Sequence, residues 1–200
     1  MLFRSNWATT APTLAQGSNT VYVRQIDVAG NTSQATAFTF TYDTQAAAPT
    51  VALVTDSGSS ADDKITNVGT LSVSGTEVGA TVQYSANGSD GWSTTAPTLS
   101  QGGNTVYVRQ IDVAGNTSQA TAFTFTYDTQ AAAPTVALVT DSGSSAVDKI
   151  TNAGTLSVSG TEVGATVQYS ANGSDGWITD RKSTRLNSSH IPLSRIPSSA

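Results

Sequence analysis

The 200-residue chain contains no cysteine, and its single histidine, His190, lies in a C-terminal segment that departs from the rest of the sequence. These absences exclude disulfide bonds, the usual cysteine and histidine zinc sites, and catalytic Ser-His or Cys-His pairs in the body of the chain. No glycine-rich phosphate loop with its lysine is present either. We therefore expect that the protein is not an enzyme.

Charged residues are also scarce, at 12% of the chain, and they are unevenly distributed. Residues 1–179 hold 13 acidic residues against five basic ones, whereas residues 180–200 hold four of the nine basic residues. An acidic body lacks the lysines and arginines that phosphate contacts need, which argues against nucleic acid as a partner. No hydrophobic run is as long as a membrane helix, and no signal peptide is recognisable, so we expect no membrane insertion in this segment.

What is present is an internal repeat of 85 residues. Trp7, Trp92 and Trp177 are each 85 positions apart, and the stretches 7–92 and 92–177 differ at five positions. The differing pairs are Ala8/Ser93, Ala15/Ser100, Ser18/Gly103, Asp62/Val147 and Val68/Ala153. A repeat of this length indicates a tandem array of small domains.

The repeat predicts the domain boundaries. We expect the C-terminal part of a truncated repeat at 1–44, a complete repeat at 45–129, and the N-terminal part of another truncated repeat at 130–179. The segments 43–49 and 128–134 both read Asp-Thr-Gln-Ala-Ala-Ala-Pro and are the predicted linkers.

Within the repeat, hydrophobic residues alternate with polar ones at a period of two. The alternation is clearest in residues 70–74, 81–85 and 122–127, and denser strands are predicted at 50–55 and 106–111. Turns rich in Gly, Asn, Asp and Ser separate these stretches, and no helical periodicity is found. The pattern predicts an all-β fold, a tandem series of immunoglobulin-like antiparallel β-sandwiches.

Three features resemble one known family. They are Asp112-Val-Ala-Gly-Asn-Thr-Ser, the Phe-rich strand ending in Tyr127-Asp-Thr before Pro134, and Asp141-Ser-Gly followed by Asp148-Lys-Ile-Thr. Together they resemble the bacterial immunoglobulin-like repeats of large secreted or surface-anchored adhesins and biofilm proteins, and the resemblance covers residues 7–179. It implies an extracellular or bacterial cell-surface location, tandem domains and, in some members, calcium at domain junctions.

Residues 180–200 break the repeat, which predicts Ser-Thr-Thr-Ala-Pro after Trp177 where the chain reads Ile178-Thr179-Asp180. The segment resembles a translated sequencing adapter, so we interpret it as a non-native tail; the alternative is a diverged C-terminal cap. MLFRSN at the N-terminus is likewise interpreted as a truncated start.

Carboxylates are the remaining candidates for a site. In an immunoglobulin-like sandwich, Glu77 and Asp112 are expected at the end that receives the incoming linker, beside Asp43. Asp56, Asp63 and Asp128 are expected at the other end, near Glu162 of the next repeat. The predicted metal ligands are Asp43, Asp56, Asp63, Glu77, Asp112, Asp128, Asp141, Asp148 and Glu162.

Clustered carboxylates repel one another unless a raised pKa or a cation neutralises them, and a set of oxygen ligands suits Ca²⁺. The alternative is that these aspartates only cap turns. Asp62 is excluded because Val147 replaces it in the next copy.

The function that we predict is that of a structural spacer in the stalk of a large bacterial adhesin, with neighbouring repeats of the same chain as partners. Calcium at the domain junctions would stiffen the stalk. One alternative is a module that binds a glycan or a host surface, for which Trp92 or Trp177 would stack on sugar; another is an accessory module of a secreted enzyme. Affinity of an isolated single repeat for a ligand would favour the binding module.

Overall fold

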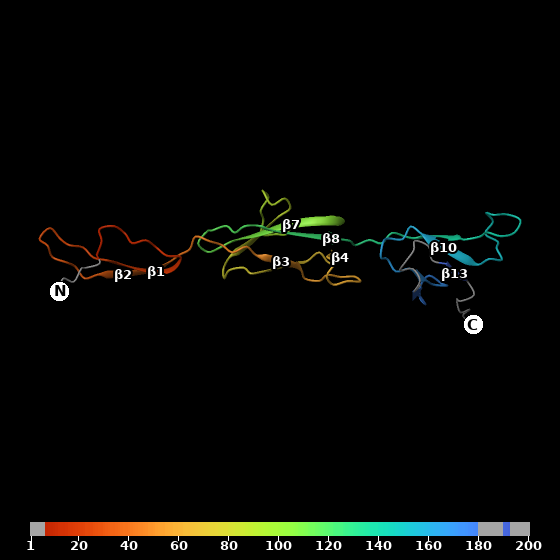
Figure 1. Ribbon diagram of the computed structural model, residues 1–200, viewed down its shortest axis with the longest axis horizontal. Helices are drawn as coiled ribbons and strands as arrows, with labels where there is room; N and C mark the ends of the chain where they lie inside the picture. The colour runs from red at the N-terminus through yellow and green to blue at the C-terminus, as the bar shows by residue number, and fades with distance from the viewer. Residues whose placement is uncertain (1–6, 180–189, 193–200) are drawn as a thin grey trace. The chain divides into compact units, whose positions relative to one another are not determined.

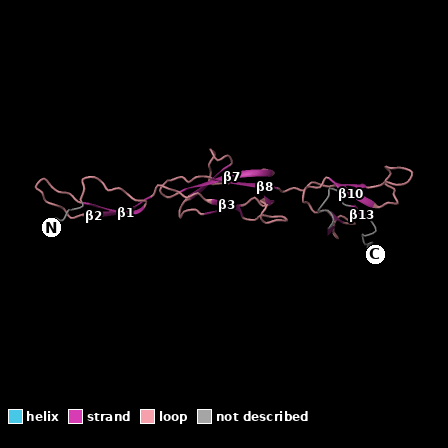
Figure 2. Ribbon diagram, viewed as in Figure 1, coloured by secondary structure: helices cyan, strands magenta, loops and turns pink. Residues whose placement is uncertain are grey.

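The computed structural model describes residues 7–179 and 190–192 (Figure 1). These residues form strands, turns and loops and no helix, which confirms the predicted all-β class (Figure 2). The chain divides into two compact units, residues 1–129 and 130–200. The strands are β1 (Gly17–Val23), β2 (Thr36–Tyr42), β3 (Thr50–Leu53), β4 (Ile65–Thr66), β5 (Leu71–Ser74), β6 (Thr81–Ser85), β7 (Gly102–Ile111), β8 (Thr121–Tyr127), β9 (Thr135–Leu138), β10 (Thr155–Ser159), β11 (Gln168–Tyr169), β12 (Ile178–Thr179) and β13 (His190–Pro192).

The complete repeat, residues 45–129, contains two sheets. One consists of β3 and β5, and the other has the strand order β4–β8–β7–β6. All pairs are antiparallel except β4 and β8, which run parallel over two residues. The strands expected from alternation are confirmed, whereas β4 is too short to be visible in the sequence pattern.

The core of this repeat lies between the two sheets, as in a β-sandwich. Val51 of β3 packs with Val106 and Val108 of β7 and Phe125 of β8, and all four are buried. Leu53, Leu71, Val73 and Phe123 are among the half-buried residues around them. Since side chains of a strand point alternately to opposite faces, the inward positions of β7 are Val106, Val108 and Gln110.

A tight loop follows β7 and places Asp112 beside the adjoining linker. The backbone N–H of Asp112 donates to the Asn116 carbonyl at 3.0 Å, and the bridge between Ile111 and Thr117 closes the loop. Gly115 has a φ of 92°, a left-handed conformation that glycine adopts without a Cβ clash. The Asp-Val-Ala-Gly-Asn motif is therefore a turn whose shape depends on its glycine.

The chain enters and leaves the complete repeat at opposite ends. Gly102, at the start of β7, lies opposite Tyr127, the last residue of β8, while Ile111 at the other end of β7 lies opposite Thr81. The linker carbonyl of Ala47 accepts a hydrogen bond near that second end, from Gln110. At roughly 3.3 Å per residue, β7 separates the two ends by about 30 Å.

The flanking half repeats are smaller versions of the same parts. Residues 7–44 carry the β1–β2 hairpin, whose register from Gly17–Tyr42 to Val23–Thr36 reproduces that of β7 and β8. The second unit carries β9 paired with β10, which corresponds to β3 paired with β5, and the small β11–β12 sheet. In the predicted tail, β13 pairs with β10, and the remaining tail residues and MLFRSN lie outside the described residues.

Candidate functional site

Three predicted ligands converge at the linker end of the complete repeat. Asp43, Glu77 and Asp112 each offer a carboxylate oxygen, and these oxygens lie within 4.8 Å of one another. Asp43 directly follows β2 of the preceding half repeat, Glu77 lies in the loop between β5 and β6, and Asp112 directly follows β7. The group therefore joins the end of one repeat to two loops of the next, as the sequence predicted.

Asp112 is the most buried member of this group. It is buried, and its two carboxylate oxygens accept hydrogen bonds from the side chain of Asn116 at 2.7 Å and its backbone N–H at 2.8 Å. The side-chain bond from Asn116 is the main reason that the pKa of Asp112 lies below its ordinary value, which desolvation opposes. Asp112 is thus held as a charged carboxylate.

Glu77 and Asp43 each use one oxygen to hold the linker. Glu77 Oε1 accepts from the backbone N–H of Ala47 at 2.8 Å, and Asp43 Oδ1 accepts from Gln16 Nε2 at 2.6 Å. Within the described part of the chain, Glu77 Oε2 and Asp43 Oδ2 accept no hydrogen bond. Each of these two half-buried residues therefore has one oxygen that remains able to bind a ligand.

The arrangement has the chemistry of a hard-cation site. Calcium–oxygen bonds of about 2.3–2.6 Å allow two ligand oxygens of one ion to lie up to about 5 Å apart. The three oxygens at this end fall within that limit, at 4.8 Å or less. Calcium accepts irregular geometry and takes further oxygens from carbonyls and water, so three carboxylates can form the protein's share of the site.

The linker is also held by neutral polar side chains that sequence reasoning missed. Gln110 Nε2 donates to the carbonyl of Ala47 at 2.6 Å, and Gln110 Oε1 accepts from the backbone N–H of Glu77 at 2.9 Å. Asn116 Nδ2 donates to the carbonyl of Asp43 at 3.0 Å, and Thr121 Oγ1 donates to that of Pro49 at 2.6 Å. Gln110 lies two residues after Val108 and therefore on the same inward face of β7. This alternation is the sequence signal that could have identified Gln110.

At the other end of the repeat, Asp56 and Asp63 do not form such a group with Asp128. Among the described residues, the three-carboxylate cluster at Asp43 is the one close enough to hold a metal. Asp56 Oδ2 accepts from the backbone N–H of Lys64 at 2.8 Å, and Asp63 Oδ1 accepts from that of Ile65 at 3.0 Å. These two aspartates therefore act as acceptors within their own loop, which is the turn-capping alternative.

The same loop recurs in the second unit with the same contacts. Asp141 Oδ2 accepts from the N–H of Lys149 at 2.8 Å, and Asp148 Oδ1 accepts from that of Ile150 at 2.9 Å. Lys149 has a φ of 61°, close to the 59° of Lys64, so the turn is a reproducible feature of the sequence. In both copies the first aspartate keeps its other oxygen, Oδ1, buried without a donor in the described structure.

Asp128 and Glu162 repeat the contacts of Asp43 and Glu77. Asp128 accepts a hydrogen bond from Gln101 Nε2, as Asp43 does from Gln16. Glu162 Oε1 accepts from the backbone N–H of Ala132 at 2.8 Å, as Glu77 does from Ala47. No position of the given sequence corresponds to Asp112 in this second copy, because the match to the repeat ends at Trp177.

The tryptophan proposed as an alternative sugar-binding residue has one ring face occupied. The guanidinium carbon of Arg109 lies 4.0 Å from the ring centroid of Trp92, and Arg24 makes the same contact with Trp7. Arg109 is further positioned by a hydrogen bond from its Nε to Gln83 Oε1 at 3.0 Å. This stacking is a cation–π contact that secures the tryptophan against the sheet.

Comparison with known proteins concerns the family of the complete repeat. No curated protein matches the chain. The described residues include no helix that could cross a membrane. The family model of the bacterial Ig-like domain matches residues 45–129. The complete repeat is thus similar to a class of module that is typically non-enzymatic and usually found in extracellular or surface proteins.

Proposed function

We propose that the chain is a stretch of spacer repeats from the stalk of a large bacterial surface adhesin, and that Ca²⁺ at the repeat junction stiffens the stalk. The observation that carries the proposal is the convergence of Asp43, Glu77 and Asp112 within 4.8 Å, since these residues come from two successive repeats. A cation bound there connects the end of one repeat to the loops of the next.

The stiffening follows from how the junction is built. The linker is short and is already hydrogen-bonded to the repeat that follows it through Gln110 and Glu77. Asp43 belongs to the end of the preceding hairpin, so an ion shared with Glu77 and Asp112 removes the remaining freedom between the two parts.

A spacer role agrees with the near-identity of the copies. The five differing positions are all exposed in the complete repeat, and none belongs to the three-carboxylate group. Repetition of an unchanged module adds length to a stalk, which sets how far an adhesive domain projects from the cell surface.

Calcium titration of the chain tests the metal part of the proposal. Extracellular modules bind calcium with Kd of about 10⁻⁴–10⁻³ M. A free calcium concentration of 10 to 100 times Kd would stabilise the complete repeat by about 1.4–2.7 kcal/mol. For a domain of this size, we expect Tm in calorimetry to rise by roughly 5–20 °C relative to EGTA.

A matched pair of variants makes the titration specific. Asp112→Asn should abolish the calcium-dependent rise in Tm. Asp27→Asn should leave it unchanged, because Asp27 makes the same bonds with Asn31 but belongs to no described three-carboxylate group. An unchanged melting curve and hydrodynamic radius of the unmodified chain on addition of Ca²⁺ would refute the metal-stiffened junction.

A further inference from the structure

The loop that precedes the repeat tryptophan contains an Asn-Gly pair, Asn87-Gly88 in the complete repeat and Asn172-Gly173 in the second unit. An asparagine before glycine can deamidate, because glycine has no side chain to keep its backbone nitrogen away from the asparagine amide. In this reaction the glycine nitrogen bonds to the asparagine Cγ and gives up its proton. The bond from Cγ to the amide nitrogen breaks, ammonia leaves, and water opens the resulting succinimide to aspartate or isoaspartate.

In the folded loop, hydrogen bonds hold both reacting groups of this pair. Asn87 Oδ1 accepts from the backbone N–H groups of Ser89 at 2.9 Å and Asp90 at 3.0 Å. Asn87 Nδ2 donates to Asp90 Oδ1 at 2.5 Å. The attacking nitrogen, that of Gly88, donates its N–H to Ser85 Oγ at 3.0 Å. Closure of the succinimide ring needs a free side-chain amide and a free glycine nitrogen, so these bonds must break first.

The sheet beneath the loop supports the closed conformation. Ser85, the last residue of β6, is 2% exposed, and its Oγ donates to the carbonyl of Asp90 at 2.6 Å. Gly88 has a φ of 76°, and a Cβ at this position would lie 2.6 Å from Cδ1 of the Tyr107 ring. Both the backbone conformation and the space therefore require glycine at residue 88. The reactive pair is thus part of the way in which the loop packs.

The same hydrogen bonds recur in the second unit. Asn172 Oδ1 accepts from the backbone N–H groups of Ser174 and Asp175, both at 3.0 Å. Asn172 Nδ2 donates to Asp175 Oδ1 at 2.5 Å, and the N–H of Gly173 donates to Ser170 Oγ at 3.1 Å. The closed conformation is therefore a property of the loop's own sequence.

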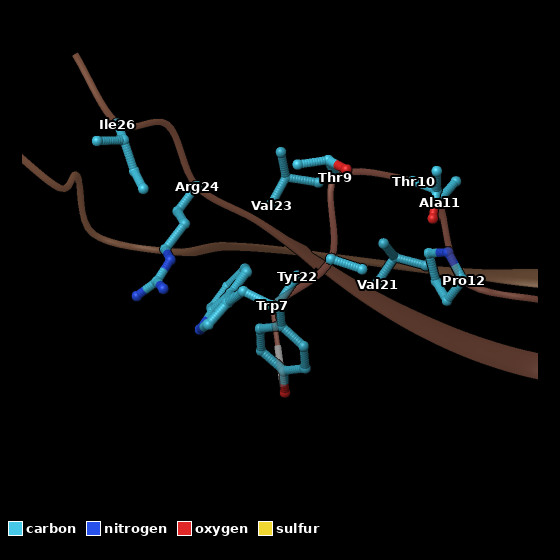
Figure 3. A pocket seen from close by; sticks show the side chains of 11 residues that line it. Trp7, Thr9, Thr10, Ala11, Pro12, Val21, Tyr22, Val23, Arg24 and Ile26 are labelled. Atoms are coloured by element: carbon cyan, nitrogen blue, oxygen red, sulfur yellow. The ribbon is translucent and has the colours of Figure 1, made fainter. Parts of the chain in front are cut away.

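The tryptophan after the loop has an anchor that does not depend on the Asn-Gly sequence. The guanidinium carbon of Arg109 lies 4.0 Å from the ring centroid of Trp92, and Arg24 lies at the same distance from Trp7. Figure 3 shows the pair of Trp7 and Arg24, where a different sequence precedes the tryptophan. The loop at Asn87 can therefore open locally while the stack and the sandwich stay in place.

We infer that Asn87-Gly88 and Asn172-Gly173 are sites of spontaneous deamidation that the folded loop keeps closed. The reaction in the folded chain then proceeds only during the fraction of time in which the loop is open. In the aspartate product, a carboxylate oxygen replaces Asn87 Nδ2 beside Asp90 Oδ1, and the two like charges repel. Because the change is covalent, a loop that has reacted cannot close in the same way again.

This inference does not rest on calcium or on the spacer role, so its test is carried out in EGTA. The 200-residue chain is incubated at mildly alkaline pH, with and without enough urea to unfold it, and then digested with trypsin. Cleavage after lysine and arginine places Asn87 in peptide 65–109 and Asn172 in peptide 150–181, so mass spectrometry measures the two sites separately. Deamidation of Asn87 should be slower in the folded chain by about tenfold or more, since each opening breaks several hydrogen bonds.

The substitution Asp90→Ala weakens one loop and leaves the other as an internal control. Asp90 is exposed and its carboxylate holds Asn87 Nδ2, so the variant frees the amide without disturbing the core. Deamidation of Asn87 in the folded variant should rise roughly three- to tenfold, the effect of losing one hydrogen bond. The rate at Asn172 should stay the same. An unchanged melting transition of the complete repeat verifies that the variant folds.

The matched control is Ser89→Ala, because Ser89 contributes its backbone N–H and not its hydroxyl to the hydrogen bonds of the loop. This variant should deamidate at Asn87 as slowly as the unmodified folded chain. In urea, the unmodified chain and both variants should react at one common rate, since the substitutions act through the folded loop.

Three results would overturn the inference. The first is deamidation of Asn87 in the folded chain as fast as in urea, which would mean that the hydrogen bonds do not restrain the reaction. The second is a folded Asp90→Ala variant that reacts no faster than the unmodified chain. The third is an Asn87 that stays unmodified even in urea.

Discussion

Replacing the same valine in two copies of the repeat separates the effect of burial from that of sequence. Val108 and Val23 occupy the same position in identical local sequence, Thr-Val-Tyr-Val-Arg-Gln. Val108 is 0% exposed and belongs to the core of the complete repeat, while Val23 is 62% exposed on an unpaired face. Val108→Ala and Val23→Ala therefore remove the same atoms from different surroundings.

The expected cost of Val108→Ala follows from its burial. The substitution removes two methyl groups, which at about 0.8 kcal/mol per buried carbon amounts to about 1.6 kcal/mol of lost transfer free energy. A cavity among Val51, Val106 and Phe125 adds to this, so we expect a total of about 2–3 kcal/mol. For a domain of this size, that corresponds to a decrease in Tm of roughly 10–20 °C.

Calorimetry measures both variants in EGTA. Urea unfolding should give the same difference in the free energy of unfolding with an unchanged slope. Val23→Ala should change the stability of the middle repeat by less than about 0.5 kcal/mol, as is usual for exposed positions. Equal effects of the two substitutions would refute the assignment of the core to the complete repeat.

Two further predictions concern the linker end. Gln110→Leu should lower the free energy of unfolding by about 1–2 kcal/mol, because the Ala47 carbonyl and the Glu77 N–H lose partly buried hydrogen bonds to Gln110. Gln25→Leu in the exposed half repeat should have little effect, and urea unfolding measures both. Because hydrogen bonds from Asn116 lower the pKa of Asp112 in the folded state, the stabilisation is present at neutral pH and is lost as the pH falls from about 4 through that lowered pKa. Stability measured against pH in EGTA should therefore fall less steeply at acid pH for Asp112→Asn, and parallel profiles would contradict the assignment.

Much of the fold could be predicted from period-two alternation. A strand with one face in the core alternates hydrophobic and polar residues, so the strands predicted at 70–74, 81–85 and 122–127 correspond to β5, β6 and β8. The parallel pairing of β4 with β8 could not, because two residues are too few to show a period. The sequence pattern also does not show which strands share a sheet, since strand pairing depends on contacts between distant segments.

The acidic site was predictable in part. From the order of loops in a sandwich, Glu77 and Asp112 were expected at the linker end. In the structure, both lie close to Asp43. The same reasoning grouped Asp56 and Asp63 with Asp128, but backbone N–H groups in their own loop engage the first two. A carboxylate in a turn has local donors within a few residues, and sequence does not reveal whether it turns toward them or toward a neighbour.

The sequence by itself determined the 85-residue period, the all-β class and the turn chemistry, because these depend on neighbouring residues and on the alternation of side chains along a strand. Only the tertiary structure decided which copy of an identical residue is buried. Val108 and Gln110 lie in a core because both halves of their sandwich are present, whereas Val23 and Gln25 are exposed. Burial is a property of contacts between distant segments, so identical sequences differ in it when the opposing sheet is absent.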